Sequence, residues 1–267
     1  MKGDNAMNSK LEVQGLSYSY HSMDGETKAL SNISFQVEEG EFLAVVGPSG
    51  CGKSTLLSIL CGLLVPEEGS VLIDGEPVKG GSPKIGYMLQ RDHLFEWRDV
   101  FSNACLGLEI RGQMDREHRE RVEMLFQSYG LAPFKNKKPS ELSGGMRQRA
   151  ALIRTLALDP DILLLDEPFS ALDYQTRLEV CDDISSIIRE NKKTAVLITH
   201  DLAEAVSAAD RIVILTKRPG SIKAVLTVRF SEPDLSPLKR RSAPEFSGYF
   251  NQVWKILENR EVSHESE

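Results

Sequence analysis

Short apolar runs separated by turn residues dominate the first ninety residues of the chain. Residues 33–37 alternate between apolar and polar side chains, which predicts a strand with one buried face. Residues 42–46 are apolar throughout, as expected of a strand that is buried on both faces. A glycine-rich turn leads from this strand into a predicted helix over 53–64, and two further strands are predicted over 71–73 and 85–89.

Helical periodicity replaces this pattern between residues 91 and 159. Gly130 ends a helix whose apolar face has the spacing i, i+3, i+4 and i+7, with side chains Val122, Leu125, Phe126 and Tyr129. A second helix is predicted over 143–158. Strands then return, separated by helical stretches, over 162–165, 195–198 and 212–215. Alternating strands and helices are typical of a parallel sheet with crossover helices, so we expect an α/β core interrupted by a helical insertion.

The two ends of the chain differ from this core. Residues 1–10 lack an apolar segment and are expected to be a flexible N-terminus, not a signal peptide. The tail from residue 231 carries one helical stripe of apolar and aromatic side chains, namely Phe246, Tyr249, Phe250, Val253, Trp254 and Leu257. We expect the stripe to pack on the chain's own surface, and docking on a partner subunit is the alternative.

Composition narrows the class of protein. The 267 residues are 41% hydrophobic and 27% charged, which is typical of a globular chain. The net charge of −7 lacks the excess of basic residues that binding to a phosphate backbone requires, so we expect no nucleic-acid partner. The longest apolar stretch, 55–65, is half the ~20 residues of a membrane-spanning helix, and we expect the chain not to cross a membrane. The four cysteines lack metal-site spacing and are expected to be buried and reduced.

A phosphate-binding loop is the clearest chemical signal. Residues 47–54, GPSGCGKS, match G-x-x-x-x-G-K-[ST] at every fixed position between a predicted strand and a predicted helix. Glycines let backbone N–H groups approach a phosphate, and the helix N-terminus adds partial positive charge. We expect Lys53 to reach the β- and γ-phosphates of ATP and Ser54 to hold Mg²⁺. The other expected nucleotide contacts are Gly47, Pro48, Ser49, Gly50, Cys51, Gly52 and Thr55. We expect Cys51 to be a small filler residue that alkylating reagents reach when nucleotide is absent.

Two adjacent carboxylates follow the predicted strand over 162–165. Ligands collect at strand ends of this kind in parallel sheets. We expect Asp166 to orient the magnesium ion and Glu167 to polarise the water that attacks the γ-phosphate. A solvated acidic turn after a strand is the alternative.

Residues 142–148, LSGGMRQ, resemble the signature motif of the ATP-binding subunits of ATP-binding-cassette (ABC) transporters. Independently, Ser143, Gly144 and Gly145 indicate a helix N-terminus with exposed backbone donors. The resemblance spans roughly 11–228. It implies an α/β fold with a P-loop NTPase (RecA-like) core, an N-terminal antiparallel β subdomain and an inserted α-helical subdomain. The corresponding division is an ATPase domain over 11–230, with its core at 11–90 and 160–230 and its insertion at 91–159, and a helical tail over 231–267.

The same resemblance implies roles for further residues. Gln90 matches the glutamine that contacts the magnesium ion or the water and reports the state of the nucleotide. Asp173 ends the sequence SALD, which resembles the loop that crosses the dimer interface. His200 matches the switch histidine that contacts the γ-phosphate. Tyr20 matches the aromatic residue that stacks on adenine, and Tyr18 is its rival.

The family also implies partners. Two cassettes close head to tail, and the signature motif of one completes the ATP site of the other. We therefore expect a homodimer beneath two transmembrane permease subunits, peripheral to the cytoplasmic face of the cell membrane. Residues 94–100 and the Arg218-Pro219-Gly220 sequence resemble importers of the nitrate, sulfonate, taurine and bicarbonate class, as does the tail around Phe246. Such importers receive the solute from an extracytoplasmic binding protein.

Some alternatives stay open at this stage. Trp97 either faces the permease or belongs to the core of the helical insertion. The cassette could serve another importer or an exporter of peptides or lipids. A soluble cassette acting on nucleic acid or ribosomes is the remaining alternative, which the charge disfavours.

Overall fold

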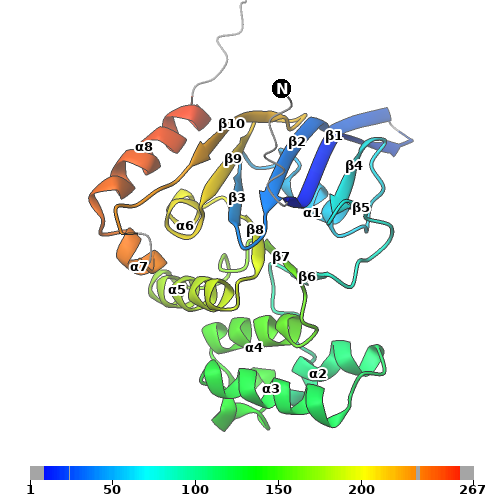
Figure 1. The fold of residues 1–267 in the computed structure, drawn as a ribbon, viewed down its shortest axis with the longest axis vertical. Coiled ribbons are helices and arrows are strands. Elements are labelled where there is room, and N and C mark those ends of the chain that lie inside the picture. Colours follow the sequence, from blue (N-terminus) through cyan, green and yellow to red (C-terminus); the bar gives the residue numbers. More distant parts are fainter. Residues whose placement is uncertain (1–8, 24, 233–234, 259–267) are drawn as a thin grey trace, which may run out of the picture. The chain divides into compact units, whose positions relative to one another are not determined.

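The computed structural model describes residues 9–23, 25–232 and 235–258 (Figure 1). The expectations for residues 1–8 and for the tail beyond residue 258 therefore lie outside the described residues. The chain divides into two compact units, one formed by residues 1–81 with 196–267 and the other by residues 82–195.

An antiparallel sheet occupies the first part of the first unit. Its strand order is β2-β1-β4-β5, with bounds β1 (Ser9–Ser22), β2 (Gly25–Glu38), β4 (Glu68–Ile73) and β5 (Glu76–Pro77). The β1–β2 hairpin pairs Tyr20 with Thr27 and continues to Ser22 and Gly25. Burial alternates along the second half of β2, as the alternation over 33–37 predicts. This sheet carries Tyr20 on its first strand.

A second group of strands in this unit has the order β10-β9-β3-β8, with β3 (Phe42–Val46), β8 (Thr194–Ile198), β9 (Arg211–Leu215) and β10 (Ile222–Thr227). The boundary between the two units falls within β8. Strands β3 and β9 pair in parallel, and every residue of β3 is buried, as its continuous apolar run predicts. Strand β10, which the sequence reading missed, pairs antiparallel with β9.

Helix α1 (Lys53–Leu60) follows β3 and is shorter than predicted. Gly62 stands in the left-handed region, at φ +78°, and a Cβ there would lie 2.9 Å from the backbone nitrogen of Gly81. Because only glycine fits such a position, the chain turns at residues 61–62 and the predicted extension to residue 64 is wrong.

The tail helix packs on the first unit, as expected. Helix α8 (Pro244–Glu258) contacts α6 (Leu202–Ala208), β9 and β10. The Val253 side chain is fully buried, and the Tyr249 hydroxyl bonds the backbone N–H and carbonyl of Arg229. The short helix α7 (Pro237–Arg240) precedes α8 and also contacts α6.

The second unit combines a parallel strand pair with helices. Strands β6 (Ile85–Met88) and β7 (Ile162–Asp166) pair from Ile85 and Ile162 onward. The helices are α2 (Val100–Ile110), α3 (Arg116–Ser128), α4 (Gly144–Leu156) and α5 (Tyr174–Glu190), with 3-10 turns at Ala132–Phe134 and Pro139–Glu141. Helices α2, α3 and α4 lie together, in green in Figure 1.

The predicted helical face of α3 is confirmed, because Val122 and Phe126 are fully buried and Gly130 turns the chain at φ +69°. Helix α4 ends two residues before the predicted boundary. No helix among the described residues is both long enough and apolar enough to span a bilayer.

Candidate functional site

The loop between β3 and α1 has the geometry of a phosphate cradle. Gly50 and Gly52 stand at φ +75° and +102°, where side chains are strained. A Cβ on Gly52 would lie 2.7 Å from Leu30 Cδ2, and one on Gly47 would lie 2.8 Å from Cys51 Sγ. The Cys51 N–H donates to the Pro48 carbonyl over 3.3 Å and closes the turn. Close packing thus accounts for Gly47 and Gly52, and the positive φ accounts for Gly50.

Helix α1 begins without a side-chain cap at Gly52. The first N–H groups of a helix have no partner within the helix, and the helix dipole places partial positive charge around them. An uncapped N-terminus that follows a glycine-rich loop is a favourable place for a phosphate group.

Lys53 is buried inside this loop, with 8% of its surface exposed. Its ammonium donates to the carbonyl oxygens of Gly47 over 2.8 Å and Pro48 over 3.1 Å. Phosphate oxygens are stronger acceptors than carbonyls because a hydrogen bond between two charged groups is shorter and stronger. The loop therefore holds the cation where an incoming phosphate group can replace its carbonyl partners.

Cys51 fills the loop, as expected, but it is not available to reagents. Only 1% of its surface is exposed, and burial raises the pKa of its thiol. A buried thiol with a raised pKa contains little thiolate and reacts slowly. The expectation that Cys51 is readily alkylated is therefore wrong for this conformation.

The structure favours Tyr20 over Tyr18 as the exposed ring near the cradle. The Tyr20 hydroxyl lies 3.0 Å from Thr55 Oγ1 in the first turn of α1, and 45% of Tyr20 is exposed. Tyr18 is half-buried and packs against Tyr20 edge to face, with 5.1 Å between the ring centroids. Tyr20 thus presents the ring that a base could stack upon.

His200 follows β8 on a turn that two buried neighbours hold. The Thr199 hydroxyl donates to the Glu204 carboxylate over 2.6 Å and accepts from the Asp201 N–H over 3.0 Å. Asp201 in turn caps α6 through the N–H groups of Ala203 and Glu204. His200 itself is exposed. Sequence reasoning missed Thr199 and Glu204, although an aspartate directly before a predicted helix signals the cap.

Asp166 and Glu167 end strand β7 in the second unit. The Tyr87 hydroxyl, from β6, donates to the Asp166 carboxylate over 3.2 Å. Glu167 stands at φ +43°, a conformation that non-glycine residues rarely adopt, and its carbonyl accepts from both the N–H and the hydroxyl of Ser170. Such strained backbone collects at functional sites.

Gln90 follows β6, and its side chain contacts the turn after β7 that contains Glu167 and Ser170. Its Nε2 donates to Glu167 Oε2 over 3.3 Å and to Ser170 Oγ over 3.2 Å. Because strands β6 and β7 are parallel neighbours, their carboxyl ends bring the predicted glutamine and glutamate together. The Nε2 atom is used in these bonds, so Oε1 is the atom of Gln90 that could bind a metal ion.

The signature residues form the N-terminus of α4. Ser143 caps this helix by accepting from the Met146 N–H over 3.3 Å. A Cβ on Gly144 would lie 3.0 Å from the Leu172 side chain, and one on Gly145 would lie 3.0 Å from Thr176. The two glycines therefore allow the start of α4 to pack closely against the segment around Asp173.

Asp173 caps the neighbouring helix, α5. Its carboxylate accepts from the Thr176 N–H over 3.1 Å, and this bond lowers the pKa of Asp173. The signature motif and the SALD sequence thus present two helix N-termini whose caps are both made by exposed side chains.

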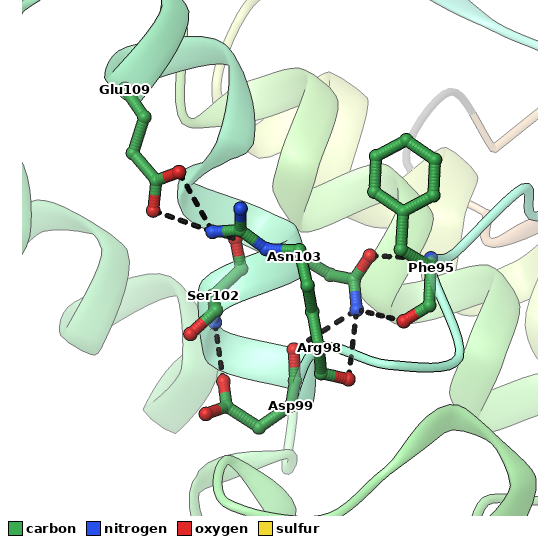
Figure 2. A network of polar contacts seen from close by, with 6 residues as sticks. All are labelled: Phe95, Arg98, Asp99, Ser102, Asn103 and Glu109. Carbon is green, nitrogen blue, oxygen red and sulfur yellow. Dashed lines mark hydrogen bonds and ion pairs between the residues drawn. The ribbon is translucent and has the colours of Figure 1, made fainter.

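A polar network around Asn103 shapes the loop after Gln90 (Figure 2). Asn103 is fully buried; its Oδ1 accepts from the Phe95 N–H over 2.7 Å, and its Nδ2 donates to the carbonyls of Phe95, Arg98 and Asp99. Arg98 bonds the Glu109 carboxylate over 2.6 Å, and Asp99 caps α2 through the Ser102 N–H. Sequence reasoning did not identify Asn103.

This loop presents Trp97 at the surface. The Trp97 ring stacks on Phe95 with 4.6 Å between centroids, and 73% of Trp97 is exposed. The alternative that Trp97 belongs to the core of the helical insertion is therefore wrong. The Trp97 side chain is therefore available for contact with another protein, and tryptophan is enriched among the residues that dominate binding between proteins.

The residues expected to bind magnesium offer oxygen atoms only: the Ser54 hydroxyl, the Asp166 carboxylate and the Gln90 amide oxygen. Oxygen donors suit Mg²⁺, which takes few protein ligands and completes its shell with phosphate oxygens and water. The described residues contain no group of three or more His, Cys, Asp or Glu side chains that could hold a metal ion. The donor set therefore fits a magnesium ion delivered with a nucleotide.

Comparisons with known proteins agree with these features. Residues 30–170 match the protein family described as ABC transporter. An uncharacterized ABC transporter ATP-binding protein of Bacillus subtilis is 44% identical over 251 residues, which cover 94% of this chain and 96% of the relative. A taurine import ATP-binding protein of Ruegeria pomeroyi is 41% identical, with 93% of each chain covered. A nitrate import ATP-binding protein of Synechocystis is 37% identical, with 94% and 96% covered.

Solved structures include a dimeric ATP-binding cassette in a post-hydrolysis state, bound to ADP and phosphate. It is 32% identical, with a TM-score of 0.70, and the match covers 82% of this chain and 99% of the other. The P-loop NTPase fold that the sequence implied is therefore confirmed.

Proposed function

The chain belongs to the ABC transporter family of ATP-hydrolysing cassettes, and we propose that it is the subunit that energises solute uptake through a membrane importer. The observation that carries the proposal is the phosphate cradle, in which Lys53 is buried among loop carbonyls beside the uncapped start of α1.

The phosphate cradle is the proposed nucleotide-binding site. The loop N–H groups and the start of α1 receive the phosphates, Lys53 neutralises the β- and γ-phosphate charge, and Tyr20 stacks on the adenine ring. Ser54, Asp166 and Gln90 would hold Mg²⁺, which supplies electrostatic stabilisation of the charge that develops during phosphoryl transfer.

Glu167 is the proposed general base for hydrolysis. Phosphoryl transfer needs a positioned water more than covalent chemistry, and a carboxylate can orient that water and accept its proton. Gln90 restrains Glu167 Oε2, and the turn closed by Ser170 fixes the backbone at Glu167. His200, at the exposed end of β8, is the proposed contact to the γ-phosphate.

Dimerisation completes the site. The backbone donors at Ser143, Gly144 and Gly145 would bind the γ-phosphate held by a second copy, and Asp173 would lie at the interface. The dimeric cassette bound to ADP and phosphate, at 32% identity, supports a homodimer. ATP then holds the two copies together, and hydrolysis lets them separate.

The proposed transport system is an importer for small anions or related solutes, such as nitrate, sulfonates or taurine. The nitrate and taurine import proteins among its relatives support this class. The proposed partners are two transmembrane permease subunits, with Trp97 as a contact, and an extracytoplasmic solute-binding protein. The subunit would then lie on the cytoplasmic face of the membrane. The division of the chain into a core, a helical insertion at 91–159 and a tail from residue 231 stays a prediction.

Affinity purification of the tagged chain from detergent-solubilised membranes tests this proposal. We expect ATPase activity to co-purify with a permease, and the binding protein of the same system to retain a small anionic solute. Recovery of the chain without any permease, with ATPase activity stimulated by nucleic acid, would refute the importer role and favour a cassette that acts outside transport.

A further inference from the structure

The loop between β9 and β10, residues 216–221, is tied to the phosphate cradle and to strand β2. The Arg218 Nε donates to the Gly50 carbonyl over 3.2 Å. The Gly220 N–H donates to the Ala29 carbonyl, and the Gly220 carbonyl accepts from the Ser31 N–H, each over 2.9 Å. The loop thus joins β2 to the most exposed turn of the cradle.

Gly220 is in direct contact with the cradle. A Cβ at this position would lie 2.1 Å from the Cys51 carbonyl oxygen, so no other residue fits without moving the cradle. Gly52 packs on Ala29 and Leu30, where a Cβ would lie 2.9 Å from the Ala29 carbonyl, and Leu30 also forms a bridge with Gly220. Residues 51–52 therefore rest against the joined edge of β2 and the loop 216–221.

Gly50 lies at an open part of the cradle, where a Cβ would meet nothing within 4 Å. Because glycine has no Cβ, this residue has access to many conformations, of which the structure shows one at φ +75°. The bond from Arg218 holds the Gly50 carbonyl, and the Cys51 N–H of the same peptide group donates to the Pro48 carbonyl. The two bonds together set the orientation of this peptide group.

We propose that Arg218 is a positioning residue for nucleotide, which orders the Gly50 turn of the cradle before ATP binds. The proposal rests on the proposed function, because it requires that the cradle binds ATP. A flexible loop that must become ordered on binding lowers affinity, and prior ordering removes part of that cost. Loss of Arg218 should accordingly weaken ATP binding while the chemical step, which depends on other residues, continues.

Purified full-length Arg218→Ala, Arg218→Lys and Lys217→Ala variants test the proposal. Lys217 is the adjacent exposed cation and its side chain has no hydrogen bond among the described residues, so it controls for surface charge. The measurements are the Kd for a fluorescent ATP analogue and the KM and kcat for ATP hydrolysis. A melting curve without nucleotide shows whether each variant is folded.

For Arg218→Ala we expect Kd and KM to rise about three- to tenfold, the range for one ordinary hydrogen bond at an exposed position, with kcat within about twofold of wild type. The Kd and KM of Arg218→Lys should lie between those of wild type and Arg218→Ala, because lysine can still donate a hydrogen bond to the Gly50 carbonyl. Lys217→Ala should match wild type.

Three outcomes would overturn the proposal. They are unchanged Kd and KM in Arg218→Ala, an equal loss in Lys217→Ala, and a loss confined to kcat. If Arg218→Ala does not fold, the same comparison is made with Arg218→Lys, for which KM equal to that of wild type counts against the Nε–Gly50 bond. Failure of the wild-type protein to bind ATP would instead overturn the proposed function itself.

Discussion

The side-chain amide of Gln90 donates to the carboxylate of Glu167, with 3.3 Å between Nε2 and Oε2. These residues follow β6 and β7, which pair in parallel, so the glutamine restrains the carboxylate proposed to activate water. A carboxylate held by an amide keeps a fixed orientation, which a general base requires.

Replacing Glu167 with Gln should separate binding from hydrolysis. The amide keeps the shape of the side chain but cannot accept a proton, so kcat should fall about 10²- to 10⁴-fold while ATP affinity stays near that of wild type. We also expect ATP to trap the variant as a dimer, seen by light scattering after gel filtration. A monomer with undiminished ATPase activity would contradict both the catalytic role and the proposed dimer.

Removal of the buried ammonium should abolish tight nucleotide binding. Charge-assisted hydrogen bonds contribute about 1.5–3 kcal/mol, so Lys53→Ala should weaken ATP binding at least about tenfold. Titration with a fluorescent ATP analogue measures this, with Lys79→Ala, an exposed lysine in the same unit, as the control. Equal affinities of the two variants would remove Lys53 from the proposed site.

The two tyrosines of β1 can be distinguished by parallel substitution. Stacking of a base on an aromatic ring contributes about 1–3 kcal/mol, so Tyr20→Leu should raise the Kd for ATP by about tenfold or more. Tyr18→Leu should leave the Kd for ATP close to that of wild type, because Tyr18 is half-buried and packs edge to face against Tyr20. The opposite order of effects would identify Tyr18 as the stacking ring.

Asn103 should be important for stability although it carries no proposed chemistry. Asn103→Ala leaves the Phe95 N–H and three carbonyls without their partner, and the expected loss of unfolding free energy is about 1–3 kcal/mol. Urea denaturation followed by tryptophan fluorescence measures it. Asn136→Ala, at an exposed asparagine in the same unit, should change stability by less than about 0.5 kcal/mol.

The ion pairs of Asp159 predict a dependence of stability on pH. The Asp159 carboxylate lies 2.5 Å from the Arg121 guanidinium and 2.8 Å from the Lys193 ammonium. These two cations lower the pKa of the Asp159 carboxyl. Because the folded pKa lies below the unfolded value of about 3.9, the stabilisation is present above that pH and is lost as pH falls through the folded pKa. The side chain is 50% exposed, so the contribution should be below about 1 kcal/mol.

Asp159→Asn is the matched variant, since asparagine also tolerates the φ of +52° at this position. It should be less stable than wild type at pH 7, and the difference should disappear in acid below the folded pKa. Urea denaturation at both pH values measures this, and a difference that persists in acid would show that charge is not the cause.

The sequence predicted the strands of the core because their apolar runs are short and bounded by glycine or charge, as at 42–46. Motif spacing predicted roles for Lys53, Glu167 and Ser143, and the structure places them at the start of α1, directly after β7 and at the cap of α4. The limit of α1 was missed because the steric contact at Gly62 involves Gly81, a contact that no local pattern reveals.

Other features were not predicted because they too depend on contacts between residues that are distant in the sequence. Asn103 and Arg218 are single polar residues whose importance depends on which backbone groups they meet after folding. All four cysteines are buried, as expected, and the expectation of ready alkylation at Cys51 failed because it rested on a loop sequence that reads as glycine-rich and open. Strand β10 lacks a continuous buried face, since its residues alternate between half-buried and exposed, and it is recognised only through its pairing with β9.

The parallel pairing of β3 with β9 has a consequence for synthesis on the ribosome. Phe42 and Asp210, which bond through backbone and side chain, are 168 residues apart, and the whole second unit is made between them. At about 5–20 residues per second, β3 waits on the order of ten to thirty seconds for its neighbour. During that interval an entirely apolar strand is unpaired on that side, so the nascent chain should depend on chaperones until translation passes residue 215.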